Sequence, residues 1–456
     1  MTGAAAPAEG GEHSARADAG APQPPSAEQA LDQLLRGAWI DPDSGRATGV
    51  AIQAIAIEPT LDGEEADRVA ALALGRRFAV VSDATTRRVL GERVERALRA
   101  VGAVEPVVLP GAPHADAATV ARVRAWCAAA DALVAVGSGT INDLAKAAAA
   151  ADGKPYVVFP TAPSMNGYTS ANAAITVDGH KKTLPAVLAR GVFVDLEVLA
   201  AAPPRMIRAG LGDSLCRSTA QVDWLLSHHL LGTPYRRAPF ALLAGDEAAL
   251  LDGAGALLAG DRDAMRLLAR TLLLSGLGMT LCGGSQPASQ GEHLISHYVD
   301  MRAAAGREPS LHGEQVAVAT LTMARLQESM LAGAAPVLAP TRATAADLER
   351  HFGAALGASC WREFEGKRLD GAGAAAMTAR LAKAWPALRR DADAARVPAA
   401  RLEAAMRRAG GPLRAADIGV GADFYAAAVR HARFLRDRYT FLDLADDAGV
   451  LEAAGA

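Results

Sequence analysis

The chain has 456 residues and a formal net charge of −3 at neutral pH. Apolar residues make up 51% of it and charged residues 21%, a balance that is ordinary for a globular protein of the cytoplasm. These values predict neither nucleic acid nor an acidic membrane surface as a partner. The length suits two domains. No uninterrupted apolar stretch is expected to be long enough to span a bilayer.

The first part of the chain, residues 1–27, is rich in Ala, Gly, Pro and Glu and has almost no large apolar side chains. Such a segment cannot bury enough surface to offset its ordering entropy, so we expect a disordered tail, followed by a helix that begins at 27–35. No apolar core follows a basic start, so no secretory signal is predicted. The four cysteines form no CxxC pair and are expected to be reduced thiols in the cytoplasm.

Between about residues 48 and 200, short apolar runs alternate with amphipathic stretches, a pattern typical of a parallel sheet flanked by helices. We therefore predict an α/β dinucleotide-binding domain over 28–203. The predicted strands are 78–83, 106–109, 132–136, 156–159 and 191–195. The predicted helices are 84–100, 115–130 and 140–151, and the Gly-, Asn- and Thr-containing segment 166–188 is expected to form a hairpin.

After about Pro204 the strand signals stop and apolar residues recur with helical spacing. Gly-rich or Pro-containing joints separate the successive helical segments. We therefore predict an all-α second domain over 204–456.

A glycine turn follows the predicted strand 132–136 and precedes the predicted helix 140–151. It consists of Gly137, Ser138, Gly139 and Thr140. Glycine allows a phosphate to approach the backbone closely, and the free N–H groups of a helix start favour an anion. Thr140 can donate a further hydrogen bond. The alternative is a plain strand-to-helix turn that needs glycine for steric reasons.

Two other strand ends bear on the hypothesis that the phosphate of a dinucleotide binds at the glycine turn. Asp83 ends the strand 78–83 and can accept hydrogen bonds from the adenosine ribose, or it can cap the helix that follows. The segment 161–168 is rich in hydroxyl and amide groups and follows the strand 156–159. Ligands bind at the carboxyl edge of open α/β sheets, although a polar surface loop would have the same composition.

The helical half contains a set of potential metal ligands. His293 and His297 lie four residues apart, on one face of a predicted helix, and His312 stands at the start of another. Asp213 follows a glycine in a further helical segment. One carboxylate and two imidazoles with an open position suit a catalytic zinc or iron ion. From residue types alone, hydrogen-bonded core histidines and a capping aspartate are the commoner outcome.

Several of these segments, taken together and in this order, carry a family resemblance. They are Gly-Ser-Gly-Thr-Ile-Asn-Asp at 137–143, Thr-Ala-Pro-Ser-Met-Asn-Gly at 161–167, Gly-Leu-Gly-Asp at 210–213, Glu-His-Leu-Ile-Ser-His at 292–297, Leu-His-Gly-Glu-Gln-Val at 311–316 and Arg-Tyr-Thr-Phe-Leu-Asp-Leu at 438–444. The chain resembles the sn-glycerol-1-phosphate dehydrogenase family over about residues 45–450. That family belongs to the wider iron-containing alcohol dehydrogenase and dehydroquinate synthase-like superfamily.

The resemblance implies a dinucleotide domain, a helical domain and a divalent metal in the cleft between them. It implies metal ligation by Asp213, His293 and His312. It also implies contacts with NAD or NADP from Asp83, Gly137, Ser138, Gly139, Thr161 and Ser164. Thr140 of the glycine turn and Asp143 in the helix that follows are further candidates for the cofactor site.

One position departs from the family pattern. Asn166 stands where these enzymes usually carry an aspartate close to the substrate. Asparagine keeps the hydrogen-bonding shape but has no charge and cannot act as a base. The exact substrate is therefore left open.

The resemblance implies reversible hydride transfer between NAD(P)H and the C2 carbonyl of dihydroxyacetone phosphate or a similar small phosphorylated ketone. The metal, zinc in preference to iron or nickel, would act as a Lewis acid. His297 and Asn166 are the candidates for substrate contact or proton transfer. Lys182, with its neighbour Lys181, is the candidate for the substrate phosphate, and Asp83 favours NAD over NADP.

Two other functions fit the same sequence. One is a dehydroquinate synthase-like lyase that uses NAD transiently, and the other is a protein that binds cofactor without turnover. We further expect a cytoplasmic homo-oligomer, a dimer or larger.

Overall fold

The computed structural model describes residues 25–302 and 310–451. Most of the predicted tail 1–27 therefore lies outside the described residues. The helix predicted at 27–35 is present as α1 (Ala27–Leu35), whose start is capped by Ser26.

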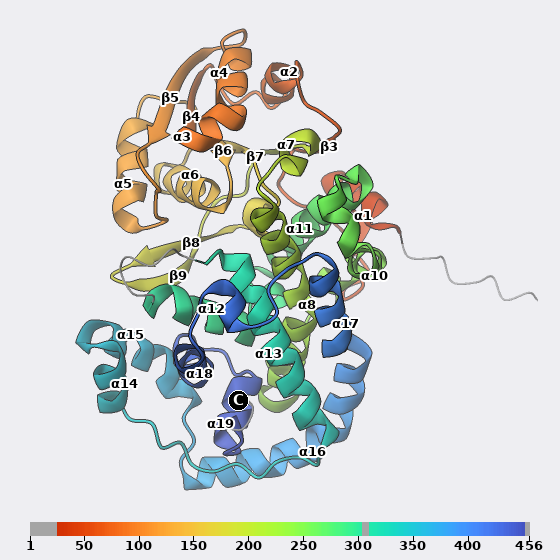
Figure 1. The fold of residues 1–456 in the computed structure, drawn as a ribbon, viewed down its shortest axis with the longest axis vertical. Helices are drawn as coiled ribbons and strands as arrows, with labels where there is room; N and C mark the ends of the chain where they lie inside the picture. Colours follow the sequence, from red (N-terminus) through yellow and green to blue (C-terminus); the bar gives the residue numbers. More distant parts are fainter. Residues whose placement is uncertain (1–24, 303–309, 452–456) are drawn as a thin grey trace, which may run out of the picture.

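A parallel six-stranded sheet forms the α/β half, drawn at the top of Figure 1. Its strand order is β3-β10-β7-β6-β4-β5. The six strands are β3 (Ala54–Glu58), β4 (Arg77–Asp83), β5 (Ala103–Leu109), β6 (Ala132–Gly137), β7 (Tyr156–Pro160) and β10 (Gly191–Asp195). All five predicted strands are thus present, and β3 is an additional edge strand.

The central strands are buried apolar runs, as expected where helices cover both faces of a parallel sheet, whereas the edge strands β3 and β5 are partly exposed. Every residue of β6 and β7 is buried. The helices of this half are α2 (Glu65–Ala70), α3 (Ala84–Thr86), α4 (Glu92–Leu98), α5 (Ala117–Trp126), α6 (Gly139–Asp152) and α7 (Leu196–Ala200). A π-helical turn at Arg87–Gly91 joins α3 to α4, which completes the predicted helix 84–100.

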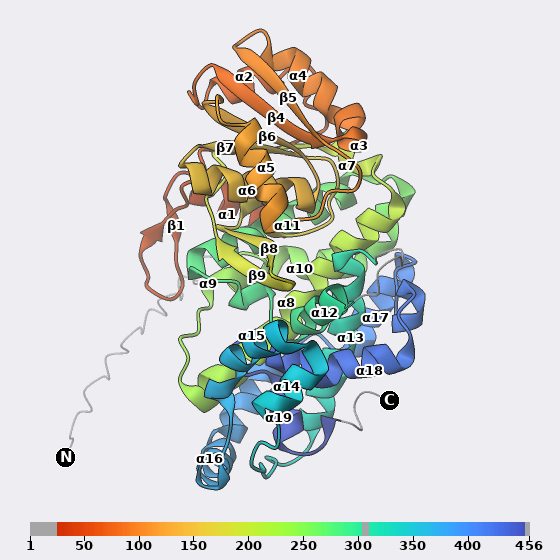
Figure 2. The ribbon, with the colours of Figure 1, turned by 90° about the vertical axis from the view of Figure 1, so that its left-hand side faces the viewer.

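Two small antiparallel pairs accompany the sheet. The pair β1 (Trp39–Ile40) and β2 (Ala47–Thr48) lies near α1. The predicted hairpin is present as β8 (Asn172–Val177) and β9 (His180–Pro185), which extends from the α/β half beside the helical half (Figure 2).

Helices make up the rest of the described chain. They are α8 (Pro204–Leu231), α9 (Ala238–Ala241), α10 (Ala244–Asp252), α11 (Arg262–Cys282), α12 (Gly291–Arg302), α13 (His312–Ala332), α14 (Ala345–Phe352), α15 (Ala354–Phe364), α16 (Gly371–Ala395), α17 (Ala399–Arg408), α18 (Ala422–His431) and α19 (Phe441–Asp447). Pro204 at the first position of α8 and Gly232 in the left-handed region after its end explain where this long helix begins and ends.

The boundary at residue 203 stays a prediction, and two observations bear on it. The last described strand, β10, ends just before it, but α1 packs on α10 and α11 of the helical half. In addition, one apolar cluster contains Leu133 of β6, Leu144 of α6 and Leu272 of α11, so it runs from the sheet into the helices. The two halves therefore share part of their core.

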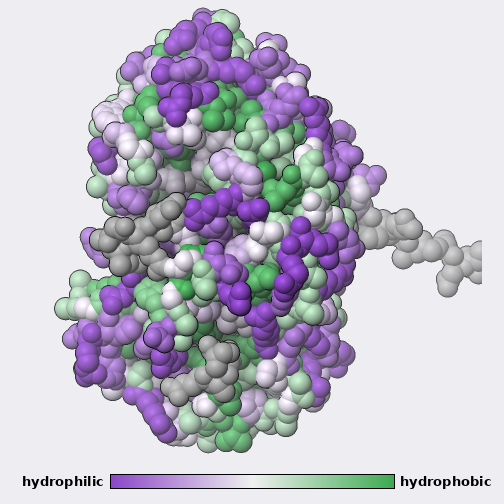
Figure 3. All heavy atoms as spheres, in the orientation of Figure 1, coloured by the Kyte–Doolittle hydropathy of each residue, from purple (hydrophilic) through white to green (hydrophobic). Residues whose placement is uncertain are grey.

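The polarity of the surface and the apolar helix α11 bear on the expectation that the chain does not insert into a membrane. Hydrophilic residues cover much of both halves on the face seen in Figure 3. Contrary to the sequence-based expectation, one described helix, α11, is long and apolar enough by length and composition to cross a membrane. In its most apolar window, 67% of the residues are buried inside the protein, as in a core helix.

Candidate active site

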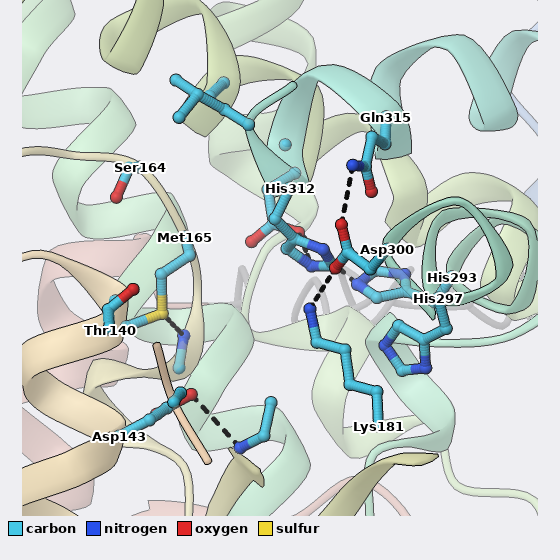
Figure 4. A pocket seen from close by; sticks show the side chains of 18 of the residues that line it. Thr140, Asp143, Ser164, Met165, Lys181, His293, His297, Asp300, His312 and Gln315 are labelled. Carbon is cyan, nitrogen blue, oxygen red and sulfur yellow. Dashed lines mark hydrogen bonds and ion pairs between the residues drawn. The ribbon is translucent and has the colours of Figure 1, made fainter. Parts of the chain in front are cut away.

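A cavity of about 900 Å³ lies where the carboxyl edge of the sheet faces the helical half. Its size is within the range of small-molecule and cofactor sites. Figure 4 shows Thr140, Asp143, Ser164 and Met165 on one wall, facing the histidines of α12 and α13 across the cavity. The site is thus built by both halves of the chain.

The glycine turn and the segment 161–167 leave the sheet side by side, because Gly137 pairs with Pro160 at the ends of β6 and β7. Neither Gly137 nor Gly139 has a left-handed backbone. Glycine is needed at 137 for space, since a Cβ there would lie 2.6 Å from Cβ of Ile141. Ser138 makes no side-chain cap to α6, so the start of this helix is left open toward the cavity.

Three helices bring one carboxylate and two imidazoles together. Nε2 of His293 on α12 lies 3.6 Å from Oδ1 of Asp213 on α8, and Nε2 of His312 on α13 lies 3.9 Å from the same oxygen. Oδ1 of Asp213 is buried and has no hydrogen-bond partner, whereas its Oδ2 accepts the backbone N–H of Asn166 at 2.7 Å. An unpartnered buried carboxylate oxygen is costly, and a cation held by the three side chains would satisfy it. The donor set fits a divalent metal.

Hydrogen bonds orient both imidazoles toward this point. Glu292 accepts from Nδ1 of His293 at 3.0 Å, which leaves Nε2 without a proton. Ser296 donates to Oε1 of Gln315 at 2.8 Å, so Nδ1 of His312 donates to the same hydroxyl oxygen at 3.1 Å. Both Nε2 lone pairs therefore face Asp213.

The pKa shifts agree with this arrangement. Burial, with the charge of Lys181, lowers the pKa of His312 to about 4, so this imidazole is neutral at pH 7. Burial by itself would lower the pKa of His293, but the neighbouring carboxylates of Asp213 and Glu292 raise it above its ordinary value. A metal cation would compete with that proton for the same lone pair.

A second group of potential ligands, Cys216, Glu292 and His293, overlaps the first. Burial raises the pKa of the Cys216 thiol well above its usual range, which disfavours the thiolate that a metal needs. Neither Cys216 nor Glu292 lines the cavity. The first group is thus the better candidate.

Most of the predicted site residues meet at the cavity. Those that line it are Ser138, Gly139, Thr140, Asp143, Ser164, Asn166, Asp213, His293, His297 and His312. Four others, Asp83, Gly137, Thr161 and Lys182, do not line it. For Asp83 the capping alternative is realised, since its Oδ1 accepts from the backbone N–H groups of Thr85 and Thr86, both at 2.8 Å.

Lys181, rather than Lys182, reaches the cavity. Successive residues of a strand point to opposite faces, so Lys181 and Thr183 share the cavity side of β9 while Lys182 does not. The ammonium group of Lys181 pairs with Asp300 (Figure 4). The assignment of the substrate phosphate to Lys182 is corrected accordingly.

Sequence reasoning passed over three residues that shape the site. The ammonium of Lys146 donates to the backbone oxygen of Gly167 in the loop that follows β7. Glu292 accepts a hydrogen bond from the proposed ligand His293, and Asp300 pairs with Lys181. Spacing could have indicated them, because Lys146 lies one helical turn after Asp143 and Asp300 lies two turns after His293. Glu292 directly precedes His293.

Comparisons with known proteins agree with the fold. Residues 56–203 match the family model described as iron-containing alcohol dehydrogenase. The solved glycerol dehydrogenase of Schizosaccharomyces pombe has a similar fold, with a TM-score of 0.59 at 16% identity, over 89% of this chain and 90% of that one. The chain thus has the fold of the iron-containing alcohol dehydrogenase class.

Relatives narrow the class to a family. The chain is 30% identical to the glycerol-1-phosphate dehydrogenase (NAD(P)+) of Bacillus licheniformis over 408 residues, which cover 88% of this chain and 90% of the relative. It is 32% identical to that of Bacillus subtilis strain 168, over 82% of this chain and 86% of the relative. The chain belongs to the glycerol-1-phosphate dehydrogenase family and is therefore an NAD(P)-dependent oxidoreductase that acts on CH–OH groups.

Proposed function

We propose that this protein catalyses the reversible, metal-dependent reduction of dihydroxyacetone phosphate, or a similar small phosphorylated ketone, to the alcohol with NAD(P)H. The observation that carries the proposal is the unpartnered Oδ1 of Asp213 beside two oriented imidazoles, across one cavity from the open start of α6. The names of the relatives support the substrate class. Homo-oligomeric assembly and a cytoplasmic location stay predictions.

Asp213, His293 and His312 would hold the divalent metal. Zinc is the expected ion because a carboxylate with two imidazoles is a usual catalytic zinc set, and the same set suits iron or nickel. Glu292 and Ser296 would act as positioning residues for the two imidazoles.

The start of α6 would bind the dinucleotide pyrophosphate through its backbone N–H groups, with Thr140 as a further donor. Ser164 lines the same wall. Asp83 stands at the end of β4, next to β6 in the sheet, and its Oδ2 makes no cap contact. That oxygen is available to the ribose hydroxyls and would repel a 2′-phosphate, which favours NAD.

When bound, the metal would polarise the ketone as a Lewis acid and the dinucleotide would supply the hydride. His297 accepts from Nη2 of Arg436 through Nδ1 at 3.2 Å, so its Nε2 carries the proton. Burial, with the charge of Arg436, keeps the pKa of His297 well below its usual value. His297 is thus a neutral donor to the substrate oxygen, and Asn166, whose amide donates to Ser275 at 3.3 Å, lines the same space.

The test is the loss of NADH absorbance with zinc-loaded protein and dihydroxyacetone phosphate, compared with NADPH and with the Asp213→Asn variant. We expect net NADH oxidation, slower turnover with NADPH, and a loss of at least about 100-fold in Asp213→Asn. Binding of NADH without net oxidation by any small ketone would overturn the proposal. A lyase on this fold would likewise show no net consumption.

A further inference from the structure

Arg436 places a positive charge at one corner of the cavity, behind Thr183 and His297. It follows α18 and the short helical turn Ala432–Phe434. Its Nη2 donates to Oγ1 of Thr183 at 2.8 Å and to Nδ1 of His297 at 3.2 Å, and both partners line the cavity. The guanidinium therefore stands directly behind two groups of the cavity wall.

No carboxylate of the described residues lies within ion-pair distance of Arg436. By contrast, the nearby Arg433 pairs with Asp443, Asp446 and Asp447. Burial, with the charge of Arg438, lowers the pKa of Arg436 to about 9, and Glu363 only partly opposes this. Arg436 is thus a half-buried cation without an ion-pair partner among the described residues.

Lys181 adds a second positive charge to the same wall. It lies two residues before Thr183 on β9, and so on the same side of the strand. Its ammonium pairs with Asp300, which Gln315 also holds at 2.7 Å. Lys181 is therefore fixed at the cavity rather than extended into solvent.

We propose that Lys181 and Thr183, with Arg436 behind them, bind the phosphate group of the substrate. The ammonium of Lys181 supplies a point charge, and the hydroxyl of Thr183, which accepts from Arg436, donates its own proton to a phosphate oxygen. The guanidinium of Arg436 orients that hydroxyl and adds positive charge next to the phosphate. The inference rests on the proposed function, because it assumes a phosphorylated ketone. It names the residues that make the site prefer this ketone over its unphosphorylated analogue.

The placement of this corner suits a three-carbon substrate. The ring of His297, which Arg436 contacts, has its centroid 6.2 Å from those of both His293 and His312. A short phosphorylated ketone can therefore hold its phosphate at Lys181 and Thr183, in front of Arg436, and its carbonyl at the proposed metal ligands. Thr140 and Ser164, at the dinucleotide wall, lie across the cavity from the histidines (Figure 4), so the two phosphate sites are separate.

The kinetic test compares dihydroxyacetone phosphate with dihydroxyacetone in wild type, Arg436→Gln, Thr183→Val and Lys181→Met. Loss of the positive charge should lower kcat/KM for dihydroxyacetone phosphate at least about 10-fold more than kcat/KM for dihydroxyacetone in Arg436→Gln. The value for dihydroxyacetone also falls, because Arg436 orients His297. Arg362→Gln, which removes an exposed arginine of α15, is the matched control and should change neither value. Equal losses for both ketones would overturn the inference.

A binding measurement separates this inference from the proposed function. Calorimetry with inorganic phosphate is carried out at saturating NAD+, so that the start of α6 is already filled. We expect phosphate binding to weaken at least about 10-fold in Arg436→Gln and not in Arg362→Gln. If no ketone is reduced, the proposed function fails, but the phosphate affinities of wild type and Arg436→Gln still show whether this site binds an anion. If Arg436→Gln does not fold, unchanged phosphate binding in both Thr183→Val and Lys181→Met overturns the inference.

Discussion

At the residue scale, the buried ammonium of Lys146 shows how one side chain holds a binding loop against helix α6. Its Nζ donates to the backbone oxygens of Gly167 at 2.6 Å and Asn172 at 3.0 Å. These contacts join α6, which starts at the glycine turn, to the loop that carries Asn166. The geometry of that loop therefore depends on a charge placed inside the protein.

This buried charge predicts a pH dependence of stability. Burial lowers the pKa of Lys146 to about 8 from 10.5, although Asp143 opposes the shift. Between these two values the unfolded chain holds more protons than the folded one, so the contribution of Lys146 to stability rises with pH. Relative to Lys146→Met, the free energy of unfolding of wild type should increase by about 2 kcal/mol between about pH 8 and pH 10.

Urea denaturation of both proteins across this pH range measures the difference. Lys383→Met, which removes an exposed lysine of α16, controls for the loss of a lysine and should show no such slope. A difference that stays flat or falls as the pH rises would contradict the prediction.

At the element scale, the close crossing of α8 and α13 sets the distance between Asp213 and His312. A Cβ at Gly212 would lie 2.3 Å from the backbone oxygen of Gly313, which directly follows His312. A Cβ at Gly210 would lie 1.5 Å from the backbone oxygen of Pro163. The glycines of the 210–213 motif thus let α8 approach both α13 and the loop of the α/β half.

Gly212→Ala should therefore separate the two helices. We expect a loss of about 1–3 kcal/mol in the free energy of unfolding, because the added methyl group meets backbone, and a zinc affinity at least about 10-fold weaker. Denaturation and zinc titration measure the two effects. Gly245→Ala, in open space on α10, is the control and should stabilise slightly. Unchanged zinc affinity in Gly212→Ala would show that the crossing does not set the ligand geometry.

At the scale of the whole molecule, the candidate metal site connects distant parts of the chain. Its three proposed ligands lie on α8, α12 and α13, and the backbone N–H of Asn166, from the α/β half, holds Asp213. A cation at this point would stabilise both halves together, because it binds only the folded arrangement.

Removal of metal should therefore lower the melting temperature of wild type. We expect a decrease on the order of 5 °C after chelation, with recovery on addition of Zn²⁺. Asp213→Asn, which keeps the size of the side chain but not its charge, should melt at the same temperature with and without chelator. Differential scanning calorimetry measures both proteins, and a wild type indifferent to chelator would contradict the metal site.

The sequence by itself determined the local structure, because periodicity and turn chemistry act over short distances. It predicted the strand, turn and helix around Gly137 and the hairpin that contains Lys181. Family motifs also pointed to Asp213, His293 and His312, although residue types alone favoured ordinary core positions for them. What remained open was which side of each element would face the cavity.

Only the tertiary structure decided that Lys181, and not Lys182, lines the cavity, because the choice depends on which face of β9 turns toward the helices. It also brought Arg436, near the end of the chain, against His297 and Thr183. No local pattern encodes such a contact, since it arises from the packing of helices and a hairpin that are far apart in the sequence. Short sequence motifs contain the reactive side chains of the site, but the packing of the core brings these side chains together.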